Sequence, residues 1–137
     1  MALTNLLLII TLTIWAEARG EPWAGKLAVA SVIVNRARER DLTWEQVCFQ
    51  PKQFSCWNNG GKKLWKQYET GECERNPAWR ECVKIVRMLI DGILPATKFN
   101  HYHNPQLCQP AWAQKLRNVK QIGNHVFGTL QDVHGQE

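Results

Sequence analysis

The chain has 137 residues and a formal net charge of +5, with 17 Lys and Arg against 12 Asp and Glu. Hydrophobic residues make up 45% of it, which is enough for one core, and we expect residues 1–137 to form a single domain. The basic residues are scattered and form no block of five or more, so the charge does not indicate a nucleic-acid-binding tail.

The N-terminal stretch MALTNLLLIITLTIWAEA has two features of a secretion signal, an apolar run and an A-x-A sequence. However, no Lys or Arg precedes Arg19, and two threonines interrupt the run, which is shorter than the roughly 20 apolar residues that span a bilayer. Apolar residues recur at helical spacing from Leu6 to Ala16. We therefore expect a structural helix from about Thr4 to Arg19, with no cleaved signal.

Glu21-Pro22 then opens a second helix, WAGKLAVASVIVNRARER, because Pro is favoured at the first positions of a helix. Its basic end complements the negative helix C-terminus. The 3.6-residue period predicts a buried stripe made of Leu27, Ala30, Ser31, Val34 and Ala37 or Arg38. Next, LTWEQV predicts a short helix with a capping box between Thr43 and Gln46.

The middle of the chain alternates loops and helices. We expect a loop over 49–61, a short helix KKLWKQYE, and a helix AWRECVKIVRMLIDG capped by Asn76 and ended by Gly92. The core face of that last helix is predicted to be Val83, Val86, Leu89 and Ile90.

Less regular sequence follows. Residues 94–110 read as irregular, AWAQKL as a short helix, and VKQIGNHVFG as a hairpin that turns at Gly123-Asn124. The predicted fold class is therefore mainly α (α+β), a helical domain with a small β-hairpin.

Five cysteines leave the disulfide pattern open. Their spacings fit no paired C-x-x-C zinc motif, and the odd number leaves at least one thiol outside any intramolecular bridge. One or two disulfides and a set of buried structural thiols are both compatible with the sequence.

Four stretches, in this order, carry a family resemblance: WAEARGEPWAGKLAVASVIVNR, FQPKQFSCW, FNHYHNPQLCQPAWAQK and IGNHVFG. The chain resembles the spore cortex-lytic, or SleB-like, cell wall hydrolases from Ile14 to Gly128. The resemblance implies a lysozyme-like, lytic-transglycosylase-type domain that cuts the MurNAc–GlcNAc glycan strands of peptidoglycan without a cofactor. It also implies that Glu17 is the catalytic glutamate.

The chain departs from this family in ways that suggest a bacteriophage endolysin used for host lysis. Family members often carry a secretion signal and a peptidoglycan-binding domain, which we do not recognise here, and the insert from Asn58 to Arg75 is unusually polar. We expect a monomer that is made in the host cytoplasm, acts on the wall in the periplasm, and depends on a holin for access. We expect no nucleic-acid partner and no stable membrane insertion.

Glycan cleavage needs an acid that protonates the leaving oxygen, whereas a free glutamate, with a pKa of about 4.3, is ionised at neutral pH. Apolar neighbours and the C-terminal end of a helix should raise the pKa of Glu17, while Arg19 should oppose the rise. Glu17 is thus a candidate general acid and, in the following step, base.

Two schemes remain open for the second half of the reaction. A two-carboxylate scheme needs a partner about 5–5.5 or 6.5–9.5 Å away, for which Glu21 is the candidate second carboxylate. In the scheme that the resemblance implies, the 6-hydroxyl of the sugar attacks and gives an anhydro product. Glu21 is otherwise an ordinary first-turn carboxylate.

Substrate-binding roles are predicted for two groups of residues. In the loop, Gln53 and Ser55 would donate or accept hydrogen bonds and Phe54 would stack on a sugar, unless they are turn residues with Phe54 in the core. The second group, Tyr102, His103 and His125, would orient the sugar or stabilise charge; His125 is equally compatible with holding the hairpin.

Asn124 is expected to be structural, since Asn tolerates the left-handed conformation of turns. Among the tryptophans, Trp57 and Trp112 are candidate sugar platforms, and Trp15 is expected in the core.

Two other functions remain as alternatives. His101, His103, Cys108 and His125 would form a zinc site in a metal-dependent amidase or peptidase that acts on wall peptides. Alternatively, the tryptophans and the positive charge would suit a non-catalytic wall-binding module. We predict no metal in the glycan-cleaving enzyme.

Overall fold

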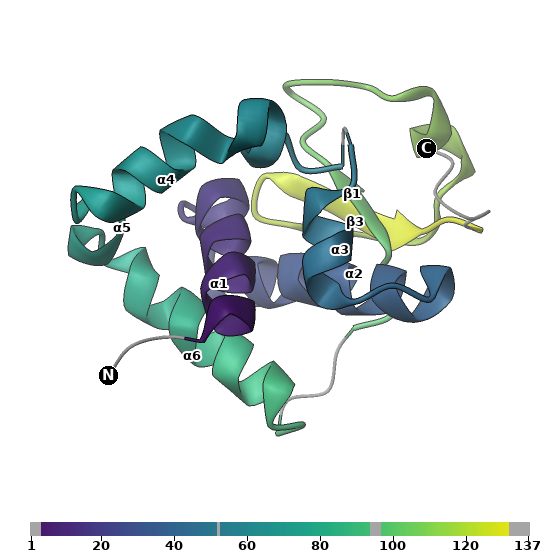
Figure 1. Cartoon of the computed structure of the whole chain (residues 1–137). Coiled ribbons are helices and arrows are strands. Elements are labelled where there is room, and N and C mark those ends of the chain that lie inside the picture. Colours follow the sequence, from purple (N-terminus) through teal and green to yellow (C-terminus); the bar gives the residue numbers. More distant parts are fainter. Residues whose placement is uncertain (1–3, 52, 94–96, 132–137) are drawn as a thin grey trace.

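The computed structural model describes residues 4–51, 53–93 and 97–131, and a helical part comes first in this range, followed by a small sheet. The elements are α1 (Asn5–Ala18), α2 (Trp23–Arg40), α3 (Trp44–Phe49), the 3₁₀ segment η1 (Ser55–Gly61), α4 (Lys62–Glu69), α5 (Glu72–Arg75), α6 (Ala78–Ile90), β1 (His101–His103), η2 (Ala111–Lys115), β2 (Arg117–Ile122) and β3 (His125–Thr129). Figure 1 shows α1 in the middle of the other helices, with the sheet to one side.

The predicted first helix is confirmed, and it is the central helix of the core. It packs against α2, α3 and α6, and its side chains from Ile9 to Trp15 are all buried. The two threonines of the apolar run are buried without an unpaired hydroxyl, because Thr11 and Thr13 donate to the carbonyl oxygens of Leu7 and Ile9 at 2.6 and 2.8 Å. No helix among the described residues combines the length and the apolar character that crossing a membrane requires.

The second helix is confirmed, but its predicted stripe is too narrow. Leu27 and Val34 are only partly buried and Arg38 is exposed, whereas most other positions from Gly25 to Ala37 are buried. The reason is that α2 packs against α1, α3 and α6 as well as β1, so more than one face is covered.

The capping box at Thr43 and Gln46 is confirmed at the start of α3, and α4 is confirmed. The loop predicted over 49–61 is wrong in part, because residues 55–61 form η1. Within η1 the backbone angles of Asn58, Asn59 and Gly60 are not helical. The turn-rich composition correctly indicates this irregular part but not the 3₁₀ turns around it. The short helix α5 was not predicted.

The helix α6 begins at Ala78 as predicted, but its N-cap residue is Pro77 and not Asn76, whose Oδ1 accepts from the Ala78 amide at 2.9 Å from one position earlier. Its predicted core face is wrong in part. Ile90 is 42% exposed and Val83 is only partly buried, while the buried face consists of Trp79, Cys82, Ile85, Val86 and Leu89. The reason is that Trp79 and Cys82 also belong to the apolar pattern. Including them turns the buried face of the helix by part of a turn, away from Val83 and Ile90.

The predicted hairpin is confirmed as β2 and β3, and the sheet has the antiparallel order β1-β3-β2. The expectation of irregular structure before it is wrong at 101–103, where β1 pairs with β3 and places Tyr102 opposite Phe127. Residues 94–96 of that stretch lie outside the described residues. Gly123, with φ 59°, supplies the left-handed position of the turn, and Asn124 does not.

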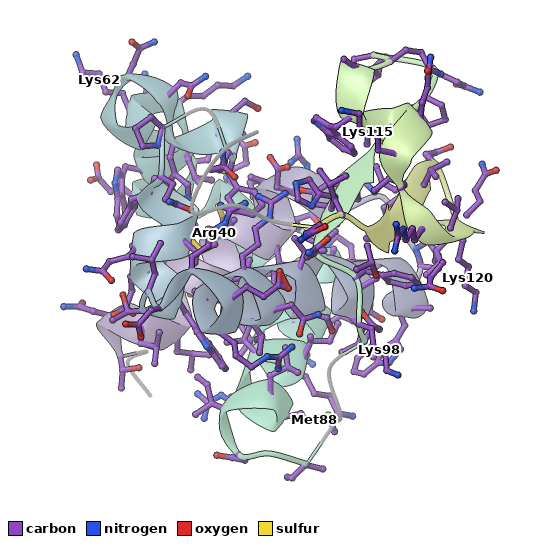
Figure 2. The ribbon with its side chains drawn as sticks, turned by 90° about the vertical axis from the view of Figure 1, so that its right-hand side faces the viewer. Arg40, Lys62, Met88, Lys98, Lys115 and Lys120 are labelled. Carbon is purple, nitrogen blue, oxygen red and sulfur yellow. The ribbon has the colours of Figure 1, made fainter. Side chains whose placement is uncertain are left out.

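All five cysteines are free thiols in the structure, with Cys48, Cys73 and Cys82 buried, Cys56 partly buried and Cys108 exposed. This arrangement corresponds to the buried-thiol alternative. The surface lysines are dispersed, as expected: Lys62 and Lys115 lie over the helical part and the sheet part, far from each other in Figure 2.

Candidate active site

Glu17 and Tyr102 join the helical part of the molecule to the sheet. Glu17 lies in the last turn of α1 and is partly buried, and Tyr102 is the middle residue of β1. The Tyr102 hydroxyl donates to Glu17 Oε1 at 2.5 Å. Both residues are candidates from the sequence, but Tyr102 is predicted there to bind substrate, whereas in the structure it binds the glutamate.

The pKa of Glu17 is raised above its ordinary value, because burial disfavours the carboxylate. The Tyr102 hydrogen bond and the charge of Arg36 oppose this rise without cancelling it. The expected opposition by Arg19 is wrong: the Arg19 guanidinium stacks 4.4 Å over the Trp15 ring and donates to the Ala16 carbonyl oxygen at 3.3 Å. Arg36 was missed because it lies on α2, far away in sequence.

Tyr102 is held as a hydrogen-bond donor. Burial and the nearby Glu17 carboxylate raise the pKa of Tyr102 well above its ordinary value, so the phenol keeps its proton. Its ring packs 5.4 Å from the Phe127 ring and 5.0 Å from that of His125. The strand pairing and these ring contacts fix where the hydroxyl points.

Glu21, the candidate second carboxylate, is 8% exposed and fully engaged by the hairpin turn. Its Oε1 accepts from the Asn124 amide at 2.8 Å and its Oε2 from Asn124 Nδ2 at 3.0 Å. His125 Nδ1 lies 3.6 Å from Oε1. The structural role expected of Asn124 therefore has a different basis: the side chain holds Glu21, while Gly123 makes the turn.

Gln53 and Phe54 face the interior. Gln53 Oε1 accepts from Arg36 Nη1 at 2.9 Å and from Arg40 Nη1 at 3.0 Å. Phe54 is only 2% exposed, so its predicted stacking on a sugar is wrong and its side chain belongs to the core. Because both α2 arginines are buried, their N–H groups need hydrogen-bond acceptors, and the loop supplies them through Gln53. The sequence does not reveal this role, because the loop and α2 are brought together only in the fold.

Three histidines gather near the sheet. His101 is fully buried and contacts Asn100, and the Trp112 ring lies 4.9 Å from His101 and 5.7 Å from His103. Burial lowers the pKa of His103 and of His125, which favours the neutral ring in each. Across the described part of the chain, no group of three His, Cys, Asp or Glu is arranged to hold a metal ion, so the residues of the zinc alternative do not form a metal site although three of the histidines lie near one another.

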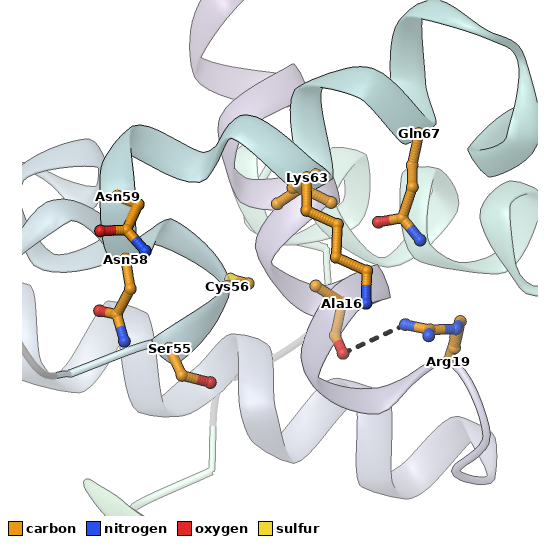
Figure 3. A pocket seen from close by; sticks show the side chains of 9 residues that line it. Ala16, Arg19, Ser55, Cys56, Asn58, Asn59, Lys63 and Gln67 are labelled. Carbon is orange, nitrogen blue, oxygen red and sulfur yellow. Dashed lines mark hydrogen bonds between the residues drawn. The ribbon is translucent and has the colours of Figure 1, made fainter.

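A pocket of about 340 Å³ opens at the end of α1, between that helix, η1 and α4 (Figure 3); Ala16, the residue before Glu17, lines it, and Glu17 itself does not. It is lined by Ala16, Arg19, Ser55, Cys56, Asn58, Asn59, Lys63, Leu64 and Gln67. Of the residues predicted to bind substrate, Ser55 is the one that lines it. Trp57 does not, because it is buried and its indole donates to Thr13 Oγ1 at 2.9 Å. The unusual polarity of residues 58–75 is the sequence feature from which this pocket could have been predicted, because several of its lining residues lie in that stretch.

Comparison with known proteins assigns the chain to a family. Residues 20–128 match the family model described as Cell Wall Hydrolase. A spore cortex-lytic enzyme from Oceanobacillus iheyensis is 34% identical over 116 residues, which is 83% of this chain and 38% of that protein. One from Bacillus subtilis is 29% identical over 121 residues, which is 87% of this chain and 36% of that protein. The chain thus spans well under half the length of these curated relatives.

Solved structures agree with the family assignment. The catalytic domain of the germination-specific lytic transglycosylase SleB from Bacillus anthracis matches with a TM-score of 0.67 at 27% identity, covering 93% of this chain and 97% of that one. The catalytic domain of the Bacillus cereus SleB protein matches with a TM-score of 0.66 at 28% identity, over 91% and 90% of the two chains.

The chain therefore belongs to the Cell Wall Hydrolase family and has the lysozyme-like fold of a SleB catalytic domain. The family resemblance stated from the sequence is confirmed, as is the expected fold class, a mainly helical, lysozyme-like domain with a small sheet. The matched range begins three residues after Glu17, so the role of Glu17 rests on its own surroundings.

Proposed function

We propose that this chain cuts peptidoglycan glycan strands as a lytic transglycosylase, with Glu17 as general acid and then base. The observation that carries the proposal is the partly buried Glu17 carboxyl, whose pKa is raised by burial and whose Oε1 is held by Tyr102. A carboxyl that keeps its proton nearer neutral pH is what protonation of a glycosidic oxygen requires. The pocket at the end of α1, which Ala16 lines next to Glu17 in the sequence, offers the strand a place to bind near the acid.

The reaction divides into two proton transfers at one side chain. Because Tyr102 donates to Oε1, the proton of the acid resides on Oε2, which donates it to the glycosidic oxygen as the bond from that oxygen to the sugar C1 breaks. The resulting Glu17 carboxylate then takes the proton of the 6-hydroxyl of the same sugar. The hydroxyl oxygen attacks C1 and closes the 1,6-anhydro ring, which restores the protonated acid without consuming water.

The surroundings of Glu21 favour this one-carboxylate scheme over a two-carboxylate hydrolase. Both of its oxygens already accept hydrogen bonds from Asn124, and the side chain is 8% exposed. A carboxylate held in this way is a poor nucleophile or base, because it would have to give up buried hydrogen bonds before reacting. Glu21 instead positions the hairpin turn against the start of α2.

The substitution Glu17→Gln tests the assignment. It keeps the shape of the side chain but removes the transferable proton, so wall-clearing activity should fall by about 10²–10⁴-fold, the usual contribution of general acid catalysis. Circular dichroism should show an unchanged fold. Clearing at the rate of the unsubstituted protein would end the proposal.

Mass spectrometry of digested peptidoglycan separates the remaining schemes. Anhydro ends are expected, because the 6-hydroxyl attacks in place of water. Reducing ends would instead indicate hydrolysis, in which case Glu21 would again be a candidate second carboxylate and Glu21→Gln would test it. Released peptides would indicate an amidase or peptidase.

We also propose that the chain acts as a monomeric endolysin that reaches the wall from the cytoplasm through a membrane lesion made by a holin. The net charge of +5 supports it, because a dispersed positive surface favours an anionic wall. Bacteria that produce the chain inside the cell should lyse when a holin is produced with it. Equal lysis without the holin would contradict this route.

A further inference from the structure

The pocket at the end of α1 is suited to a ligand other than a neutral sugar. Its lining includes the amide side chains of Asn58, Asn59 and Gln67 together with the Ser55 hydroxyl, all able to donate hydrogen bonds. It lies near the candidate acid, since its lining includes Ala16, the residue before Glu17 on α1, and Cys56, whose pKa is raised by burial and by the charge of Glu17.

Two cations face each other across this pocket. Figure 3 shows the Lys63 ammonium group and the Arg19 guanidinium pointing toward one another. None of the nine described residues that line the pocket is acidic. The two acids near the lining are engaged by other groups: Glu72 accepts a hydrogen bond from Gln67 Nε2 at 2.9 Å, and Glu17 accepts one from the Tyr102 hydroxyl at 2.5 Å. Like charges that converge without a counter-charge favour an anion between them.

Arg19 is preorganised for this role. Its guanidinium is held over the Trp15 ring and by the carbonyl oxygens at the end of α1. A guanidinium fixed in this way presents its remaining N–H groups as a fork that matches the two oxygens of a carboxylate. Lys63 brings a second positive charge from α4, so the site combines one oriented donor with one flexible donor.

We propose that this pocket binds a carboxylate carried by the muramic acid substituent of the glycan strand, namely a carboxylate of the peptide stem, while Glu17 acts on the neighbouring glycosidic bond. The inference rests on the proposed function for its substrate. The sugar rings of the strand are uncharged, so carboxylates on the muramic substituents are the anionic groups that a strand brings to the pocket. The site would make the enzyme prefer strands that carry peptides.

Binding, rather than cleavage, is the appropriate test. The Glu17→Gln protein is titrated with soluble strands in three forms: untreated, with their peptide carboxyls converted to amides, and stripped of peptides by an amidase. We expect the untreated strands to bind about fivefold more tightly than the amidated strands, the upper range for a solvent-exposed ion pair. Adding Lys63→Glu should abolish that difference. Lys62→Glu, with the same charge change on the same helix but outside the lining, should preserve it.

The outcomes separate the inference from the proposed function. Equal binding of untreated and amidated strands, or the same loss in both lysine variants, would overturn the inference even if the enzyme cuts. Stripped strands keep the lactyl carboxylate, so if they bind like untreated strands the lactyl group and not the peptide stem occupies the pocket. A carboxylate preference in a protein that never cleaves strands would refute the proposed function and leave the pocket assignment standing.

Discussion

The hydrogen bond between Tyr102 and Glu17 makes the pH dependence of activity predictable. It stabilises the carboxylate and so holds the pKa of Glu17 below the value that burial alone would set. In Tyr102→Phe the pKa of Glu17 should rise further, and the alkaline limb of kcat/KM, which reports loss of the acid proton, should move to higher pH. The rate at the optimum should fall about tenfold, because the carboxyl is no longer oriented.

The chain contains its own control for this change. Tyr68 is the other tyrosine, and its ring packs against Trp65 and Trp79 on the helical side. Tyr68→Phe removes the same hydroxyl from outside the site and should leave the pH profile where it is. An alkaline limb that stays put or moves to lower pH in Tyr102→Phe would show that this hydroxyl does not bind the carboxyl during turnover.

Burial of Glu17 should also cost stability as the pH rises. Because the pKa of Glu17 is raised on folding, the folded state holds a proton that the unfolded state has lost above pH 4.5, and stability falls as pH rises through the folded pKa. Glu17→Gln removes this dependence. Its melting temperature relative to the unsubstituted protein should therefore increase between pH 4 and pH 8. A constant difference across that range would contradict a raised pKa.

At the level of single residues, the sequence identifies the acid but not what surrounds it. Glu17 is recognisable because a carboxyl beside an apolar run is unusual. Tyr102 and Arg36, which set its pKa, lie on other elements, and only the folded chain brings them together. Phe54 was misassigned for the same reason: an aromatic residue in a turn-rich loop looks exposed until the position of the loop is known.

At the level of elements, the hairpin turn is coupled to the start of α2 through a close contact. Gly123 has φ 59°, and a Cβ there would overlap Glu21 Oε1 and lie 3.1 Å from Pro22 Cδ. Gly123→Ala should therefore lower the free energy of unfolding by about 2–4 kcal/mol, from left-handed strain together with overpacking. Denaturant unfolding measures this loss.

Gly20 provides the matched comparison, because it lies beside the same corner and a Cβ added there would meet nothing within 4 Å. Gly20→Ala should change the free energy of unfolding by no more than about 0.5 kcal/mol. If the two alanine variants were equally stable, the turn would not be packed against Glu21.

The elements that the sequence predicted well are those with local signals. Caps and periodicity were sufficient for α1, α2, α3, α4 and α6, and Gly123 was sufficient for the hairpin. By contrast, β1 has only three residues and forms because it pairs with β3, so the sequence of His101–His103 does not by itself predict a strand. The face of α6 was rotated because burial of Cys82 and Trp79 depends on which helices pack there.

At the scale of the whole molecule, class and fold were accessible from the order of four motifs, while the state of the cysteines was not. Spacing alone allows disulfides, because it does not place the thiols relative to one another. In the structure all five are free thiols, three of them buried. Stability must therefore come from packing around α1 rather than from covalent bridges.

Thiol reactivity tests this arrangement across the whole chain. Burial raises the pKa of Cys48 and Cys82 to about 12 and of Cys73 to about 11, and it also raises the pKa of Cys56. Since the thiolate is the reactive form, an aromatic disulfide reagent at pH 8 should modify only the exposed Cys108 rapidly in the folded protein.

In denaturant all five thiols should react, and Cys108→Ser should remove the fast phase of the native protein without lowering its melting temperature. A reducing agent should leave the melting temperature of the unsubstituted protein unchanged, because reduction has no bridge to break. Fewer than five reactive thiols after unfolding, or a melting temperature that falls with reductant, would mean that the protein in solution carries a disulfide. Such a bridge would require the Cα atoms of its two cysteines to lie within about 7 Å of each other.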